Sequence, residues 1–412
     1  MRIAYFLTEF PAISQPFVLY QIIGAIEHGH EVVLFVPEFT SEGKEHSLIG
    51  QYGLYEKAYS YRDYPKNYLK RILFALGHVV KSDLWKSPLV ILSALNFMKY
   101  GRDAASLKLL IACSRVYSAR DYDVVHCQFA NLGPFVSKLK NIGALSGRLL
   151  VSARGFDVTK HLVDKPGLYD GLLNDAERFL PVSSSLKQTL LALGSDEAKI
   201  EVVHSGMNVA SFPFVIHEID TTKTVKLLSV GRLVEKKGFE YAIQAVSLLA
   251  KQGVKIEYVI IGDGGLRNKL ESLVAELKLM GVVHFAGACS HEEVKAHFAS
   301  ADIFLAPSVV ALDGDQEGIP NVLKEAMAVG VPVISTYHSG IPELVEHGVS
   351  GLLVSERDAE GLMAAIKQML ADKERTRTMT FSARTKVETA FDNQVINARL
   401  NDIYLAKSDT DY

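Results

Sequence analysis

Hydrophobic and polar positions alternate along the chain in the pattern of parallel α/β domains. Short apolar runs, the first at 3–7 and 31–36, are separated by longer stretches in which apolar residues recur at helical spacing. This first series continues in runs at 124–126, 149–152, 179–182 and 200–204. A second series follows in runs at 226–230, 256–261, 282–285, 303–306, 331–335 and 351–354. Because parallel strands need crossover helices, we expect two doubly wound, Rossmann-like α/β domains.

The boundary between the two series predicts the domain organisation. A polar stretch at 221–224 separates them and indicates a first domain at 1–212 and a second at 213–390. An amphipathic stretch at 393–405 follows the completed second series, so residues 391–412 are expected to add a C-terminal helix. Doubly wound sheets bind ligands beyond the carboxyl ends of their strands. We therefore expect a ligand site in a cleft between the two domains.

The composition of the chain excludes several classes of protein. Its 412 residues are 48% hydrophobic and 22% charged, as in soluble globular proteins. A net charge of -3 argues against a dedicated nucleic-acid binder. Apolar stretches such as 88–98 fall short of the roughly 20 residues of a spanning helix, and no signal peptide is recognisable. Three cysteines without C-x-x-C spacing disfavour a disulfide framework or a zinc site. These features predict a cytoplasmic protein.

Charge is distributed unevenly, because residues 60–120 carry eleven basic and three acidic residues. Aromatic residues, among them Tyr68, Phe74 and Trp85, are interspersed with this excess of positive charge. Such a mixture is typical of a helix pair that rests on an anionic membrane surface. A helix pair that packs in the core and keeps its lysines solvated explains the mixture equally well. Both interpretations remain open at this stage.

The segment 313–328 carries two glutamates on either side of a predicted helix N-terminus. Pro320 favours the first turn of a helix that ends at Gly330. Glu317 then precedes this helix, and Glu325 lies about a turn and a half inside it. A helix N-terminus offers free N–H groups to an anion such as a diphosphate, and the two carboxylates can accept hydrogen bonds from hydroxyl groups. Taken alone, two glutamates more often form a solvated pair on an ordinary helix.

A basic loop after the strand at 226–230 adds the second half of this candidate site. Gly231 and Gly238, at its two ends, let the backbone approach a ligand closely, and Arg232 and Lys237 can both face one anion. Together with the helix N-terminus, this loop predicts a site for a diphosphate leaving group. The fingerprint G-x-G-x-x-G is absent after the first strand, which argues against a dehydrogenase.

Four patches of the sequence resemble family 4 glycosyltransferases of the GT-B fold, in which two Rossmann-like domains face a central cleft. These patches are residues 231–238, 261–264 and 306–308 and the pair Glu317 and Glu325. Closer likeness to bacterial exopolysaccharide enzymes of the colanic-acid-biosynthesis type lies at 10–17, 313–328, 335–343 and 350–354. The resemblance covers nearly all of residues 200–405 and shorter patches before them.

What the resemblance implies is a retaining transfer of a sugar from a nucleotide-sugar. Arg232 and Lys237, on the loop that begins at Gly231, would bind the donor diphosphate. Glu325 would bind the ribose hydroxyls, and Glu317 would hold the transferred sugar at the reacting centre. The family's last helix crosses back to the first domain, as residues 391–412 would here. The remaining donor-binding positions would be Gly318, Ile319, Pro320 and Asn321 around the sugar and diphosphate, and Pro307 and Ser308 beside the base.

The first domain departs from the family's pattern in two places. Relatives often carry H-x-H after the central strand, whereas here His126 is followed by Gln128 in the second position. Either Gln128 or His126 would contact the reacting sugar, and a lone histidine at a strand end is otherwise more often a structural hydrogen-bonder. Arg154 stands where relatives often have a histidine and would face an acidic or phosphorylated acceptor.

A metal site and a different cofactor are both unexpected. Asp313-Gly-Asp315 resembles the metal-binding D-x-D of the other glycosyltransferase fold. Here Arg232, Lys237 and the helix N-terminus already supply positive charge, so we expect no metal and no other cofactor.

The resemblance and the residues together predict a metal-independent, retaining hexosyl- or deoxyhexosyltransferase. Its donor would be a nucleotide-sugar, and its acceptor a saccharide, expected to be lipid-linked, in cell-surface or exopolysaccharide biosynthesis. We expect a cytoplasmic enzyme at the inner face of the membrane, with anionic lipid and no nucleic acid among its partners. Two alternatives remain: a synthase that glycosylates a soluble glycan or small molecule, and a catalytically inactive nucleotide-sugar-binding protein.

Overall fold

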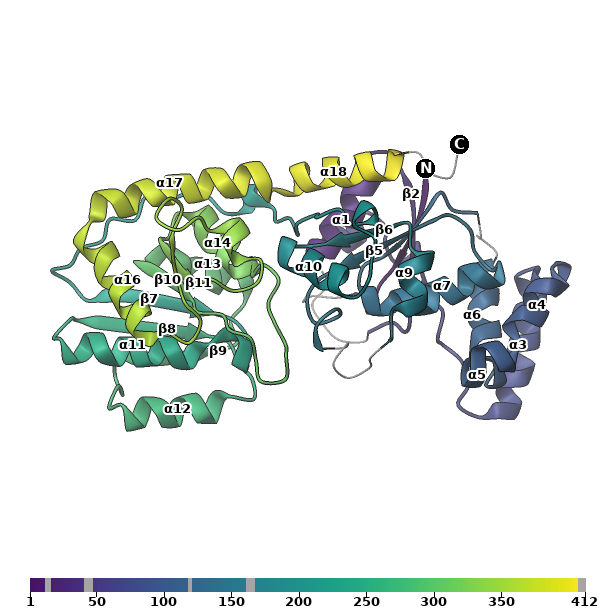
Figure 1. Cartoon of the computed structure of the whole chain (residues 1–412), viewed down its shortest axis with the longest axis horizontal. Coiled ribbons are helices and arrows are strands. Elements are labelled where there is room, and N and C mark those ends of the chain that lie inside the picture. Colours follow the sequence, from purple (N-terminus) through teal and green to yellow (C-terminus); the bar gives the residue numbers. More distant parts are fainter. Residues whose placement is uncertain (12–15, 41–46, 118–120, 161–166, 407–412) are drawn as a thin grey trace. The chain divides into compact units, whose positions relative to one another are not determined.

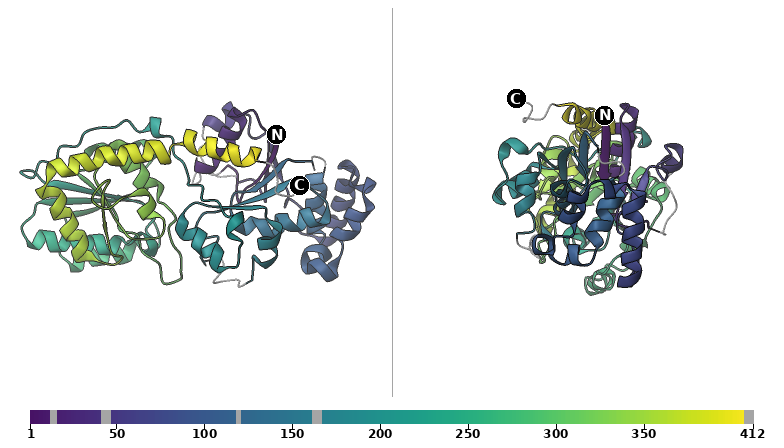
Figure 2. Two further views of the ribbon diagram at one scale, coloured as in Figure 1. Left: turned by 45° about the horizontal axis from the view of Figure 1, so that its top comes forward. Right: turned by 90° about the vertical axis from the view of Figure 1, so that its right-hand side faces the viewer.

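The computed structural model describes residues 1–11, 16–40, 47–117, 121–160 and 167–406, so residues 12–15 of the motif at 10–17 lie outside it. The chain divides into two compact units (Figures 1 and 2). The first contains the chain up to Pro181, then Thr189–Val203, and the chain from Asn397 onward. The second contains Val182–Gln188 and His204–Ile396. Residues 182–188 and 204–212, which we expected in the first domain, thus pack with the second unit.

The first unit is built on a parallel six-stranded sheet with the strand order β3-β2-β1-β4-β5-β6. Its strands are nearly all buried, because helices cover both faces of the sheet. Helices α1 (Pro16–Glu27), α2 (Ser47–Gln51), α7 (Gly133–Ile142), α9 (Asp170–Asp175) and, from Thr189 on, α10 (Ser184–Ala192) accompany the strands. The strands are β1 (Arg2–Phe6), β2 (Glu31–Val36), β3 (Ala58–Ser60), β4 (Val124–Cys127), β5 (Arg148–Ala153) and β6 (Arg178–Pro181).

The prediction of a strand at 200–204 is wrong. The backbone N–H groups of Glu201 and Val203 donate to the carbonyls of Phe179 and Pro181, but this segment forms no more than an isolated bridge at Ile200. The short strand β3 was missed, because three residues give too short a pattern to recognise.

The described residues 61–117 form a helical group between β3 and β4 rather than the expected helix pair. Its four α-helices are α3 (Tyr68–Lys81), α4 (Pro88–Ala94), α5 (Phe97–Ala105) and α6 (Lys108–Tyr117), with a 3-10 turn at Leu84–Lys86. The buried helix α6 contacts the other three helices and also α7, which follows β4. Figure 1 shows the group beside the sheet of the first unit.

The second unit contains another parallel six-stranded sheet, with the strand order β12-β11-β10-β7-β8-β9. In both sheets the chain starts in the middle, builds outward on one side, and returns to build the other side, which is the Rossmann arrangement. The strands are β7 (Val225–Val230), β8 (Ile256–Ile261), β9 (Val283–Gly287), β10 (Ile303–Ala306), β11 (Val333–Thr336) and β12 (Leu352–Val354). The helices around it are α11 (Phe239–Lys251), α12 (Arg267–Glu276), α13 (His291–Ser300), α14 (Asn321–Val329), α15 (Ile341–Leu344), α16 (Ala359–Ala371) and α17 (Lys373–Ala390).

The last helix, α18 (Asn393–Leu405), matches the amphipathic stretch seen in the sequence. From Asn397 on it belongs to the first unit, where it meets the middle of the sheet. The Tyr404 hydroxyl lies 2.9 Å from the hydroxyl of Tyr5, and the Asn401 side chain lies 2.8 Å from His30 Nε2. Among the described residues, no helix is both long and apolar enough to cross a bilayer.

Candidate functional site

The predicted donor-binding residues lie where the strand order of the second sheet reverses. Strands β7 and β10 are neighbours there, although each begins a different half of the sheet. The loop Gly231–Gly238 follows β7, and Pro307 and Ser308 follow β10. Ligands of doubly wound sheets bind beyond the carboxyl ends of the strands at such a switch point.

Close backbone contacts fix these two loops to each other. The N–H of Val309 donates to the carbonyl of Lys236 at 2.9 Å. Gly238 adopts a positive φ of 63°, and a Cβ there would lie 1.9 Å from the carbonyl oxygen of Pro307. Only glycine meets both conditions without displacing backbone. Ser308 is buried, and its carbonyl accepts from the Thr336 hydroxyl.

Glu317 lies between two ammonium groups. Its Oε2 is 3.3 Å from Lys237 Nζ, and its Oε1 is 3.5 Å from Lys236 Nζ. The Glu317 side chain is only 13% exposed. Burial by itself would raise the pKa of this carboxyl, but the charges of Lys237 and Lys236 outweigh it and lower the pKa below its ordinary value. Glu317 is therefore ionised at neutral pH.

Lys236 is a site residue that sequence reasoning missed. Its Nζ also lies 3.1 Å from Asp315 Oδ1, so one ammonium contacts two carboxylates of the segment between β10 and α14. The sequence shows two adjacent lysines and gives no reason to prefer the first, because the side chain that faces inward depends on the 3-10 turn at Glu235–Lys237. Among the described residues, no cluster of His, Cys, Asp and Glu has the arrangement of a metal site.

Arg232 and the N-terminus of α14 provide further positive charge in this loop cluster. The Arg232 side chain is exposed and makes no hydrogen bond or ion pair with another described residue. Pro320 occupies the N-cap of α14 and has no side chain to accept from the first N–H groups, which include that of Asn321. Gly318 and Ile319 precede this cap, and the Gly318 carbonyl accepts from the N–H of Gly340.

Glu325 lies inside α14 and differs from Glu317 in its electrostatic surroundings. Burial raises its pKa to about 7, because the nearby charges of Lys324 and Lys295 offset the cost of desolvation only in part. No hydrogen bond from another described residue holds its carboxylate. The adjacent Lys324 is fully buried and donates to the carbonyl of Ser205 at 2.5 Å.

A buried histidine supports the backbone of Glu317, and sequence reasoning missed this contact too. The N–H of Glu317 donates to His338 Nε2 at 3.2 Å, so Nε2 carries no proton. The proton is therefore on Nδ1, which lies 2.6 Å from Glu356 Oε1. Glu356 Oε2 also accepts from the N–H of Val310. Glu356 thus holds both ends of the segment 310–317, one directly and one through His338.

His126 and Gln128 are fully buried in the first unit, at the switch point of its sheet. His126 Nδ1 lies 2.8 Å from the Tyr404 hydroxyl, and Nε2 lies 2.9 Å from the Ser152 hydroxyl. Burial, aided by the charge of Arg154, lowers the pKa of His126 to about 3, so the ring is neutral. Gln128 Oε1 accepts from Arg154 at 2.5 Å. Both side chains are held by hydrogen bonds within the protein, an arrangement that suits the positioning of neighbouring residues. Contact of either side chain with a sugar stays a prediction.

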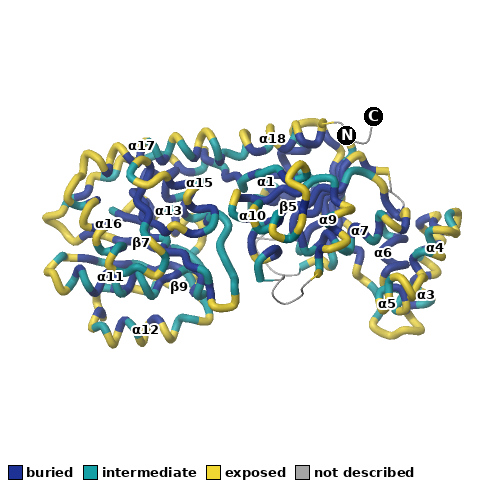
Figure 3. Tube along the Cα trace, in the orientation of Figure 1, coloured by how far each residue is buried: buried dark blue, intermediate teal, exposed yellow. Residues whose placement is uncertain are grey.

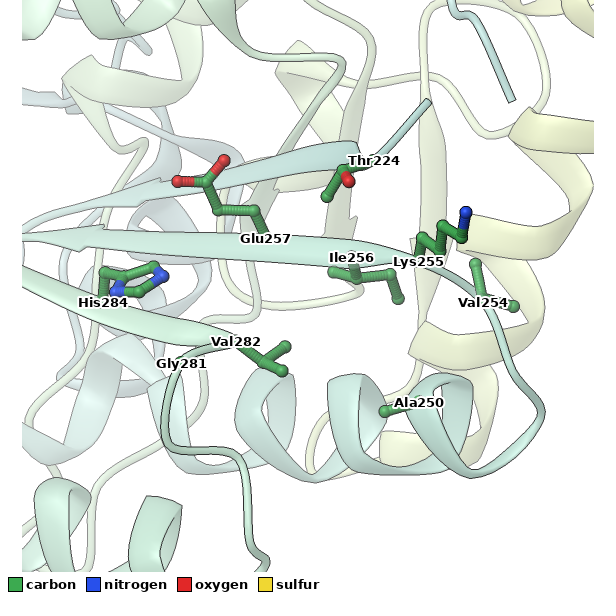
Figure 4. Close-up of a pocket in the computed structure, with 9 residues that line it drawn as sticks. All are labelled: Thr224, Ala250, Val254, Lys255, Ile256, Glu257, Gly281, Val282 and His284. Carbon is green, nitrogen blue, oxygen red and sulfur yellow. The ribbon is translucent and has the colours of Figure 1, made fainter. Parts of the chain in front are cut away.

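A pocket elsewhere on the second unit does not belong to this site. It is lined by Thr224, Lys255, Ile256, Gly281 and Val282, among others (Figure 4). These residues stand at or just before the starts of β7, β8 and β9, whereas the loops described above follow strand ends. The pocket and the loops of the candidate site therefore lie at opposite ends of the strands of one parallel sheet.

Known families and proteins match this chain in sequence and in fold. Residues 215–386 match the family described as glycosyl transferases group 1. The chain is 35% identical to the putative colanic acid biosynthesis glycosyltransferase WcaL of Salmonella typhimurium, over 97% of this chain and 98% of that one. It is 33% identical to the amylovoran biosynthesis glycosyltransferase AmsK of Erwinia amylovora, over 98% and 99% of the two chains.

A solved structure with the same fold is that of HepE of Anabaena in complex with UDP and glucose. It covers 99% of this chain and 100% of its own, with a TM-score of 0.72 at 16% sequence identity. This likeness confirms the GT-B fold that the sequence predicted. The fold, the family match across the donor loops and the full-length relatives lead to one conclusion: the chain belongs to the group 1 glycosyltransferases.

Proposed function

We propose that this protein is a retaining family 4 glycosyltransferase that uses a nucleotide-sugar and no metal ion. The observation that carries the proposal is the contact of Glu317 with Lys236 and Lys237 beside the open N-terminus of α14. An ionised carboxylate can accept hydrogen bonds from sugar hydroxyls, and the cations next to it can bind a diphosphate. One site thus recognises both halves of a nucleotide-sugar.

The chemistry follows from where charge develops during the reaction. The bond between the anomeric carbon and the diphosphate oxygen breaks, and negative charge grows on the diphosphate. Arg232, Lys237 and the first N–H groups of α14 stabilise that charge. The acceptor hydroxyl attacks the same face of the sugar, its proton passes to the leaving phosphate oxygen, and the anomeric configuration is retained.

The acceptor we propose is a lipid-linked saccharide in exopolysaccharide biosynthesis, reached at the inner face of the membrane. The support is the likeness over the full length to enzymes named for colanic acid and amylovoran biosynthesis. The donor we propose is a nucleoside diphosphate sugar of the kind bound by HepE, whose structure holds UDP and glucose.

A turnover assay with a chelator tests this function. The protein is incubated with nucleotide-sugars in EDTA, and NMR follows the anomeric configuration of the first product. We expect release of nucleoside diphosphate and a product with the configuration of the donor. An inverted product, or activity that EDTA abolishes, would contradict the proposal. Nucleotide-sugar binding without any hydrolysis or transfer would instead identify an inactive binding protein.

The raised pKa of Glu325 predicts how nucleotide affinity depends on pH. If the Glu325 carboxylate accepts from the ribose hydroxyls, binding requires it to be deprotonated. As pH falls from about 8 to about 6, through the pKa of about 7, we expect the affinity for the nucleoside diphosphate to fall by about tenfold. The variant Glu325→Gln should bind weakly at every pH and lose this dependence. Equal pH profiles for the two proteins would show that Glu325 does not face the ribose.

The contact between His338 and the backbone of Glu317 predicts a loss of turnover without a loss of nucleotide binding. His338→Phe removes the acceptor of the Glu317 N–H, so the carboxylate is less well placed, and we expect kcat to fall about tenfold. His338→Gln, whose amide can both accept and donate, should recover part of the rate. Steady-state kinetics and calorimetric titration measure the two effects. A weaker nucleotide affinity in His338→Phe would mean that the whole donor site has been disturbed.

A further inference from the structure

The helical group of the first unit exposes a continuous apolar stripe along α3. Leu69, Leu73, Leu76 and Val80 are exposed and follow one another three or four residues apart, which places them on one side of the helix. Leu73 is 72% exposed. The opposite side of α3 holds the buried residues Arg71, Ala75 and Val79 and faces α6. The apolar stripe is therefore the solvent side of α3, where polar residues are normally found.

The apolar surface extends beyond α3 into the next elements. Trp85, on the 3-10 turn, is 55% exposed, and Leu89 and Leu92 of α4 are exposed on one side of that helix. Met98, at the start of α5, is 87% exposed. Figure 3 shows exposed residues along α3, α4 and α5. A surface of this extent marks an interaction site, because isolated exposed leucines are common but contiguous rows of them are not.

The charged residues around the stripe identify the partner. Lys66 and Lys70 lie at the start of α3, and Lys81 and Lys86 lie at and after its end, all exposed. Arg71 does not belong to this set, because its buried guanidinium donates to the carbonyls of Pro65, Lys66 and Ser106. Arg71 therefore faces the protein and not lipid. Leucines flanked by lysines, with an aromatic residue between, are the composition of helices that lie in a membrane interface.

A second copy of the chain is a poorer partner for this surface. Residues 60–120 carry eleven basic and three acidic residues, so two such surfaces would bring like charges together. Lysine is also depleted in protein interfaces, whereas anionic headgroups complement it. We infer that α3, the turn after it and α4 insert their apolar side into a bilayer that contains anionic phospholipid. The inference extends the proposed function, because a lipid-linked acceptor lies in such a bilayer.

The only tryptophan of the chain allows a direct test, because Trp85 lies within the proposed surface. The full-length protein is mixed with vesicles of phosphatidylcholine containing about one-third phosphatidylglycerol, and with vesicles of phosphatidylcholine alone. We expect co-sedimentation with the anionic vesicles, together with a blue shift of Trp85 emission and its quenching by brominated lipid. Apolar insertion is not screened, so part of the blue shift should persist at about 1 M salt.

Variants separate insertion from simple charge attraction. Leu69→Gln, Leu73→Gln, Leu76→Gln and Val80→Gln together should lower the vesicle partition coefficient on the order of 100-fold. Lys66→Gln, Lys70→Gln, Lys81→Gln and Lys86→Gln together should lower it at least about tenfold at low salt and leave little salt dependence. The matched control is Met280→Gln with Val349→Gln, which replaces exposed apolar residues of the second unit and should change nothing.

Two results would overturn the inference. The first is a wild-type protein that leaves Trp85 emission unchanged with anionic vesicles. The second is a wild-type dimer that the four substitutions on the stripe convert to a monomer while vesicle binding stays the same, which would make this face a protein interface. No donor or acceptor is needed for these measurements, so a failure here is distinct from a failure of the proposed transferase activity. Circular dichroism and thermal unfolding of the variants serve as the check that they are folded.

Discussion

Replacement of Arg232 or Lys237 by alanine is expected to lower kcat about 100-fold or more. Both cations belong to the loop after β7, and in the proposed mechanism they stabilise charge that grows on the diphosphate as the glycosidic bond breaks. The loss of one such preorganised group typically costs about 3–4 kcal/mol of transition-state stabilisation. Initial-rate kinetics with a saturating nucleotide-sugar measure the effect.

The control for this experiment is Lys251→Ala, which removes an exposed cation from the far end of α11. It should leave kcat unchanged. Lys237→Ala also removes one of the two ammonium groups beside Glu317, so its effect should be larger than that of Arg232→Ala. Near-normal turnover in both Arg232→Ala and Lys237→Ala would show that the diphosphate binds elsewhere.

Replacing Glu325 and Glu317 by glutamine, one at a time, is expected to impair two different properties, nucleotide binding and turnover. Glu325→Gln should weaken the binding of the free nucleoside diphosphate about 10- to 100-fold, since a hydrogen bond to a charged group contributes about 1.5–3 kcal/mol. Glu317→Gln should retain that affinity and lose turnover by a factor on the order of 100 or more. The reason is that Glu317, in the proposed site, would face the transferred sugar, which the free nucleotide lacks.

The contacts of Glu317 sharpen this second prediction. In the free protein its carboxylate forms ion pairs with the ammonium groups of Lys236 and Lys237. A diphosphate in the proposed site would need the same ammonium groups. Glu317→Gln removes that competition, so its affinity for the nucleoside diphosphate should be equal to or higher than that of the wild type. Calorimetric titration compares the two variants directly. An equal loss of affinity in both would mean that their roles have been assigned wrongly.

The sequence predicted the positions of the loop after β7 and of α14 well, because local rules govern them. Pro320 and Gly330 delimit α14, which runs from Asn321 to Val329, and Gly238 has the positive φ that its glycine allows. The alternation of strands and helices likewise predicted both parallel sheets, because periodicity along the chain determines which residues face the core. The likeness to a known family then assigned roles to residues within these loops.

Contacts between distant segments could not be read from the sequence. His338 supports Glu317 from the loop after β11, and Glu356 reaches both His338 and Val310. Nothing in the spacing of these residues indicates that they meet. In the same way, the burial of His126 depends on Tyr404, which lies 278 residues further along the chain. Burial and hydrogen-bond partners of this kind depend on how the elements pack, which periodicity does not determine.

The exposed face of α3 shows a related limit. The basic and aromatic residues at 60–120 allowed both a membrane surface and an ordinary core helix pair. An amphipathic pattern reveals that two sides of a helix differ, but α3 buries Arg71 with its small residues and exposes its leucines. Only the position of α6 decides which side is covered.

Titration of nucleoside diphosphates by calorimetry, in EDTA, tests the central claim most directly. The wild type is compared with a double variant that carries Arg232→Ala and Lys237→Ala, and UDP, GDP and ADP are each used in turn. We predict that at least one of them binds the wild type without a metal ion, and that the double variant binds it at least about 100-fold more weakly. Binding of equal strength to both proteins, or no binding of any of the three to the wild type, would contradict a metal-independent donor site at the β7–β10 switch point.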